Sequence, residues 1–127
     1  MSLNTPLKNA RGLGSAREGV AHWWGQRMSA VALIPLGVWF MFSLVRIAMG
    51  GDHALLTQWL GSPLNASLTT VMIAVLFYHS QLGIQVVIED YVHTEWLKIG
   101  SLILQKFAHI LLAVAAIFAV LKIAFGG

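Results

Sequence analysis

The sequence contains no cysteine and very little charge. Only 10% of its 127 residues are charged, 57% are hydrophobic, and the mean hydropathy is +0.75. A soluble domain typically has about 25% charged residues, so most of this chain is expected to face lipid or other membrane helices. The absence of cysteine excludes disulfides, iron–sulfur ligation and thiol catalysis by this chain. A redox function would therefore need a cofactor with other ligands, and histidine is the expected one.

The basic residues are few and dispersed along the chain, which argues against a nucleic-acid-binding surface. The formal net charge is only +3, and a binding surface for nucleic acid would require a basic cluster. The expected partners are therefore membrane lipid and other membrane helices.

Three apolar stretches are long enough to cross a bilayer, for which about 20 residues are needed. The expected order is an N-terminal cytoplasmic arm at 1–27, spans at 28–49, 66–88 and 99–125, an outer loop at 50–65 and a cytoplasmic loop at 89–98. The predicted fold class is an all-α membrane protein with three transmembrane helices that form part of a hetero-oligomeric bundle. Pro35 lies inside the first span and predicts a kink there.

The distribution of Lys and Arg predicts the orientation of these spans. Basic residues precede the first span and flank the start of the third, whereas only Arg46 and Lys122 lie on the opposite side. Cytoplasmic loops carry the excess of Lys and Arg, so we expect a cytoplasmic N-terminus in a bacterial inner membrane. Residues 1–20 also resemble a mitochondrial transit peptide, and the mitochondrial inner membrane is the less favoured location.

The aromatic residues support the same placement, with one exception. Trp23, Trp24 and Trp96 fall at the expected cytoplasmic interface, and Trp59 falls in the outer loop, as in an aromatic belt. Trp39 lies in the middle of the first span and does not fit this pattern.

The second span carries polar side chains although it has no formal charge. His79, Gln81 and Gln85 all lie within 66–88. A polar group in hydrocarbon is costly unless it has a partner, so these side chains should face the interior of the bundle.

One face of this span has features of a haem-binding helix. At about 100° and 1.5 Å per residue, Gly83, Val86 and Asp90 share a face with His79, which lies near the bilayer centre. Imidazole is a usual axial ligand of haem iron, and a glycine one turn away leaves room for a flat macrocycle. The alternative is that His79 hydrogen-bonds to another helix and Gly83 allows close helix packing. Spacing alone favours this alternative.

The Asp90–Tyr91 pair closes the same segment at the aqueous boundary. A phenol and a carboxylate at that depth can supply hydrogen bonds and a route for protons. Taken alone, the pair is better explained as an interfacial tyrosine beside an ordinary acid at a helix end.

The stretch HSQLGIQVVIEDYVH, residues 79–93, resembles the H-x3-G-x6-D-Y core of the succinate dehydrogenase membrane-anchor family, specifically its small hydrophobic cytochrome b chains. The segment from His22–Trp23 to Arg27 and Ser29 resembles the H-W-x3-R segment before the first span in mitochondrial members. Chain length and three-span topology also match, so the resemblance covers nearly the whole chain.

The resemblance implies a role for each of five residues. His79 would be one axial ligand of a haem b iron, and Gly83 would pack against the haem. Arg27 would contact the haem propionates or their surroundings. Tyr91 would hydrogen-bond a carbonyl oxygen of ubiquinone, and Asp90 would belong to the same ubiquinone site. The second axial histidine would come from a companion cytochrome b anchor subunit.

The function implied is that of the membrane anchor of succinate:ubiquinone oxidoreductase, respiratory complex II. The chain would not oxidise succinate, because a flavoprotein and an iron–sulfur subunit would do so in the tricarboxylic acid cycle. It would dock the iron–sulfur subunit and take part in electron transfer to ubiquinone. The alternatives are the anchor of a quinol:fumarate reductase and a non-enzymatic three-helix scaffold or transporter subunit.

The remaining histidines carry weaker expectations. His22 either approaches the propionates or the iron–sulfur subunit, or has a structural role at the interface. His93 completes a D-Y-V-H pattern but is also explained as a loop residue. His109, in the third span, is expected to hydrogen-bond between helices, and His53 is expected to be solvated.

Overall fold

The structure, a computed structural model, describes residues 6–7 and 17–126. Its helices are α2 (Arg17–Gly50), α3 (His53–Leu60), α4 (Pro63–Tyr91) and α5 (Glu95–Ala124). The described part contains no β-strand, and α2, α4 and α5 are each long and apolar enough to span a membrane. The predicted class, an all-α membrane protein with three spanning helices, is confirmed. Each helix extends beyond its expected span at one or both ends.

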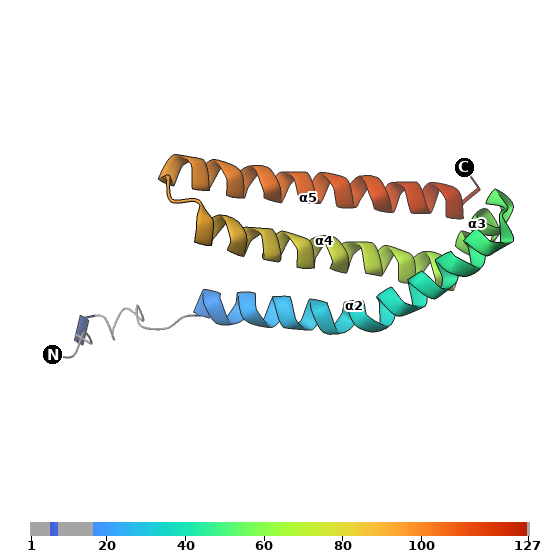
Figure 1. The fold of residues 1–127 in the computed structure, drawn as a ribbon, viewed down its shortest axis with the longest axis horizontal. Coiled ribbons are helices and arrows are strands. Elements are labelled where there is room, and N and C mark those ends of the chain that lie inside the picture. The colour runs from blue at the N-terminus through green and yellow to red at the C-terminus, as the bar shows by residue number, and fades with distance from the viewer. Residues whose placement is uncertain (1–5, 8–16, 127) are drawn as a thin grey trace.

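The three long helices form a single layer with α4 in the middle (Figure 1). Helix α4 packs against both α2 and α5, whereas α2 and α5 make no contact with each other within the described ranges. Successive helices run in opposite directions, so the start of α2 and the end of α5 lie at opposite ends of the layer (Figure 1). This arrangement suits a chain that crosses a bilayer an odd number of times.

Local sequence signals set the ends of the helices. Gly51 adopts a positive φ of 65° after α2, a conformation that glycine adopts without strain. The side chain of Asp52 then accepts a hydrogen bond of 2.9 Å from the Ala54 N–H and caps α3. Pro63 occupies the first turn of α4, where its missing N–H costs nothing.

Helix α3 was not foreseen from the sequence, which predicted only a loop at 50–65. It folds back against the end of α2, where the Trp59 ring lies 5.3 Å from Trp39 and 6.2 Å from Phe40. The Asn65 side-chain amide of α4 donates to the Trp59 carbonyl at 3.0 Å. These contacts explain Trp39, whose position in the middle of the span did not fit an aromatic belt.

Helix α2 bends in its second half (Figure 1), and Pro35 lies inside it. The bend agrees with the kink expected at this residue, because proline removes one hydrogen bond from the helix.

In its first half, α2 approaches α4 closely at Gly25. A Cβ atom at this position would lie 2.5 Å from the Tyr78 hydroxyl oxygen and 3.3 Å from Leu82 Cδ1. Glycine at this position therefore leaves room for the Tyr78 and Leu82 side chains between the two helices.

Few side chains are buried within the described part of the chain. Those that are buried line the contacts of α3 and α4 with their neighbours, together with one residue of α2; they are Leu60, Ala66, Met72, Leu82, Ser29 and Thr69. Most large apolar side chains are exposed, and α5 has no buried residue at all. A single layer leaves both of its broad faces to lipid or to other subunits.

A bulky residue at position 25 should weaken the contact between α2 and α4. We expect Gly25→Leu to lower the free energy of unfolding by about 1–3 kcal/mol, because the side chain would overpack the site. Gly37→Leu, on the same helix, is the control, since a Cβ there meets no atom within 4 Å. Thermal unfolding of the detergent-solubilised protein measures both. Equal midpoints for the two variants would contradict the close contact.

Candidate functional site

A cavity of about 620 Å³ opens between the first half of α2 and the second half of α4. Its volume falls within the roughly 300–1,000 Å³ typical of small-molecule and cofactor sites. Helix α2 contributes His22, Trp23, Gln26 and Arg27, and helix α4 contributes His79, Gly83 and Val86. The predicted shared face of α4 is thus confirmed for His79, Gly83 and Val86.

His79 is half-buried in the wall of this cavity, and one of its ring nitrogens is already bonded. Its Nδ1 lies 2.8 Å from the Ser29 hydroxyl oxygen on α2. The structure shows no hydrogen-bond partner for Nε2 among the residues it describes. One imidazole nitrogen therefore joins the two helices, and the other remains available.

Gly83 lies one turn from His79 and has no side chain that would narrow the cavity. A Cβ at this position would meet only the Gln26 side-chain nitrogen, at an ordinary contact distance of 3.7 Å. Packing within this chain does not require glycine here, in contrast to Gly25. The lack of a side chain at Gly83 instead leaves open the surface of α4 beside the imidazole.

The α2 side of the cavity contains polar atoms without partners. His22 Nε2 and Gln26 Oε1 are both buried and form no hydrogen bond, which is costly unless a ligand or another subunit supplies a partner. Sequence reasoning did not single out Gln26. Its position four residues after His22, on the same helical face, was the signal available.

Arg27 is exposed at the edge of the cavity. Its guanidinium lies 5.5 Å from the centre of the Trp23 ring, a cation–π contact. It makes no ion pair with the acidic side chains that the structure describes. A cation held by an aromatic ring beside a cavity is suited to an anionic ligand group.

Asp90 and Tyr91 end α4 but do not line the cavity. Both side chains are exposed, and 77% of Tyr91 is accessible. They lie at the end of the layer where α2 begins (Figure 1), the same end as Arg27. The structure thus gathers three of the five predicted site residues in one cavity and leaves the acid–tyrosine pair on an open surface nearby.

The donor set of the cavity fits a haem held from one side only. Residues 6–7 and 17–126 contain no group of three or more His, Asp or Glu side chains that could hold a metal ion. A haem shared with a second subunit would need one imidazole from this chain, together with an open flank and a cation for its carboxylates. His79, Gly83 and Arg27 provide these three features.

Comparisons with known proteins show the family of this chain. The model of the family described as succinate dehydrogenase/fumarate reductase transmembrane subunit matches residues 1–121. The chain belongs to this family. The succinate dehydrogenase hydrophobic membrane anchor subunit of Paracoccus denitrificans is 34% identical over 122 residues, 96% of this chain and 93% of the relative. The protein of the same name from Rickettsia bellii is 35% identical over 115 residues, 90% of each chain. No solved structure gives a significant match.

In this family member, the third-span histidine has a structural role. His109 Nε2 lies 3.1 Å from the Ser80 hydroxyl oxygen on α4, and its Nδ1 lies 2.7 Å from the Gln105 carbonyl oxygen. The predicted hydrogen bond between helices is confirmed. His93 and His53 are both exposed.

The glutamines of α4 are satisfied along their own helix. The Gln81 amide donates to Gln85 at 3.1 Å, and the Gln85 amide donates to Glu89 at 3.1 Å. The row runs from the middle of α4 towards its exposed end. Both glutamine side chains are half-buried, and their expected place in the interior of the full bundle stays a prediction.

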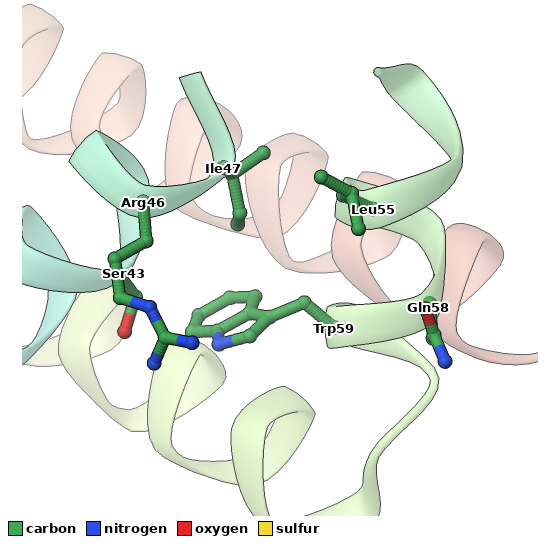
Figure 2. Close-up of a pocket in the computed structure, with 6 residues that line it drawn as sticks. All are labelled: Ser43, Arg46, Ile47, Leu55, Gln58 and Trp59. Carbon is green, nitrogen blue, oxygen red and sulfur yellow. The ribbon is translucent and has the colours of Figure 1, made fainter. Parts of the chain in front are cut away.

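A second pocket of about 260 Å³ lies at the opposite end of α2, against α3. Figure 2 shows Arg46 and Trp59 pointing towards each other across it, with Ser43 beside them. The Arg46 guanidinium also lies 6.0 Å from the Phe42 ring. Arg46 thus lies among aromatic rings at the end of the span, as expected of a long basic side chain there.

Removing the Ser80 hydroxyl should weaken the contact between α4 and α5. We expect Ser80→Ala to cost about 1 kcal/mol, because His109 Nε2 would lose its partner. Thermal unfolding of the solubilised protein measures this loss. Thr70→Ala is the control, since its hydroxyl bonds only the Ala66 carbonyl of its own helix. A variant as stable as the control would show that the bond does not hold the helices together.

Proposed function

We propose that this chain is the cytochrome b membrane anchor of a succinate:ubiquinone oxidoreductase. One observation carries the proposal: a half-buried imidazole, a glycine one turn away and an arginine meet at a single membrane-facing cavity. Family membership supports the type of complex, and the cavity supports the cofactor. When bound, haem b would supply one-electron transfer at this depth in the membrane.

Each residue of the cavity has a defined task in this proposal. His79 Nε2 would hold the iron. Gly83 leaves the surface of α4 free for the face of the macrocycle. Arg27 pairs with the propionates through a charge-assisted hydrogen bond, and the unpartnered His22 and Gln26 side chains bond polar groups at the same edge.

A second iron ligand would come from a companion anchor subunit. The single layer of helices leaves one side of the cavity open, and His22, the other histidine that lines it, precedes the expected first span. A histidine on the helix of a partner that covers this face would hold the iron from the other side. The haem is then shared between two chains.

The ubiquinone site forms at the cytoplasmic end of α4. The Tyr91 phenol donates a hydrogen bond to a quinone carbonyl oxygen, and Asp90 orients the phenol or passes protons from the water. Because Tyr91 is 77% exposed in this chain, the other walls of the site belong to the companion anchor and the iron–sulfur subunit.

The chain takes no part in succinate oxidation itself. The cytoplasmic end of the helices docks the iron–sulfur subunit, to which the flavoprotein subunit binds. We place the complex in a bacterial inner membrane with the N-terminus inside, as the asymmetry of basic residues favours. The family also includes fumarate reductase subunits. The relatives described above carry the succinate dehydrogenase name, which favours succinate oxidation.

Removing the imidazole should abolish haem binding. We expect His79→Ala to eliminate the reduced-minus-oxidised b-type spectrum of membranes that contain the assembled complex, because a cavity without this ligand cannot hold the iron from this side. His109→Gln is the control, since this half-buried histidine binds Ser80 and Gln105 rather than a ligand. An undiminished spectrum in His79→Ala would refute the assignment of His79 as a haem ligand.

Removing one hydroxyl should impair quinone reduction. We expect Tyr91→Phe to lower the rate of succinate-driven ubiquinone reduction about fivefold, the value of one lost hydrogen bond of about 1 kcal/mol. Succinate oxidation with a soluble artificial acceptor should be unchanged, because that reaction bypasses the membrane site. Tyr78→Phe, the other tyrosine of the chain, is the control. Equal loss with both acceptors would indicate impaired assembly instead.

A further inference from the structure

We infer that Ser29 is a positioning residue that fixes the tautomer and the orientation of the His79 imidazole, so that Nε2 carries the lone pair. This inference rests on the proposed haem site. Ser29 is not among the residues that line the cavity, and it acts through His79 alone.

The proton arrangement follows from two distances. The Ser29 hydroxyl lies 3.0 Å from the Gln26 carbonyl oxygen and 2.8 Å from His79 Nδ1. A carbonyl oxygen only accepts hydrogen bonds, and a serine hydroxyl has a single proton to donate. Both bonds can form together only if Ser29 donates to Gln26 and accepts from an Nδ1–H group. The opposite tautomer satisfies one bond and loses the other.

The Nδ1–H tautomer leaves Nε2 unprotonated, which is the form of a metal ligand. A hydrogen bond at the second ring nitrogen also fixes the plane of the ring and increases the electron-donor strength of the coordinating nitrogen. In isolation an imidazole would rotate and exchange tautomers. The bond to Ser29 removes that freedom before any ligand arrives.

Burial makes this bond difficult to replace. Only 4% of the Ser29 surface is accessible, the lowest fraction on α2 among the described residues. Water therefore cannot take the place of the hydroxyl without a rearrangement of the helices, and loss of the hydroxyl would leave Nδ1 without a partner.

The sequence places Ser29 where such a contact is possible. Gly25 lies four residues earlier and allows α2 to approach α4 beside Tyr78, so the same helical face reaches His79 one turn later. A serine has the length to bridge this short gap while still bonding the carbonyl three residues before it. Two small residues one turn apart thus produce a close contact and a directed hydrogen bond.

The test is Ser29→Ala in the assembled complex, with two readouts that do not depend on turnover. We expect haem to transfer to excess apomyoglobin at least tenfold faster, since the loss of an outer partner of a metal-ligating histidine commonly costs about 10–100-fold in affinity. We also expect the haem midpoint potential to rise, because a weaker donor at Nε2 stabilises the ferric state less. Unchanged transfer and an unchanged potential would overturn the inference.

Three further variants separate this effect from a change in packing. Ser29→Thr keeps the hydroxyl and should restore both readouts, whereas Ser29→Cys offers only a weak acceptor and should change both in the same direction as alanine. If the complex with Ser29→Ala fails to assemble, Ser29→Cys still tests the inference. Ser43→Ala removes another α2 hydroxyl bonded to a carbonyl, that of Trp39 at 2.9 Å, and should change neither. An equal shift in Ser43→Ala would overturn the inference.

The same experiments distinguish failure of the inference from failure of the proposed function. If the wild-type complex carries a haem that His79→Ala removes, but Ser29→Ala behaves as wild type, only the role of Ser29 is wrong. If His79→Ala keeps the haem, the proposed site is wrong, and the inferred role of Ser29 is wrong as well.

Discussion

The contact between α2 and α4 is the constraint on which the functional part of this molecule depends. Gly25 allows the two helices to approach, and Ser29 and His79 join them one turn later through a 2.8 Å hydrogen bond. Both residues of that bond are polar, and in a membrane a polar group must find its partner within the protein. The same contact that holds the helices together therefore also orients the side chain that faces the cavity. The packing of α2 against α4 and the orientation of His79 thus depend on the same contact.

The rest of the architecture follows from having only three long helices in one layer. With α4 in the middle, each outer helix packs against a single long neighbour, and few side chains become buried. Hydrophobic burial contributes little to helix association in lipid. Short-range contacts hold the helices together instead: the close approach at Gly25, the Ser80–His109 bond and the aromatic cluster of Trp39, Phe40 and Trp59. Each of these contacts joins a different pair of helices.

Much of this arrangement was predictable from the sequence. The three spans followed from apolar length, and the shared face of His79, Gly83 and Val86 followed from helical geometry, because both signals are local in the chain. Helix α3 was missed because an eight-residue helix among glycine and proline resembles a loop. The Ser29–His79 bond was not predictable, since it joins positions 50 residues apart and depends on which faces of the two helices meet. For the same reason, helical geometry aligned Asp90 with His79, but the cavity ends before reaching it.

The order of the helices along the chain has a consequence for biosynthesis. Because α5 touches only α4 and the short α3, the half of the molecule that carries the cavity consists entirely of residues translated before α5. The Ser29–His79 bond joins α2 and α4 and needs no contact from α5. An oriented imidazole can thus face the membrane, and whichever partner arrives there, before the last helix has docked.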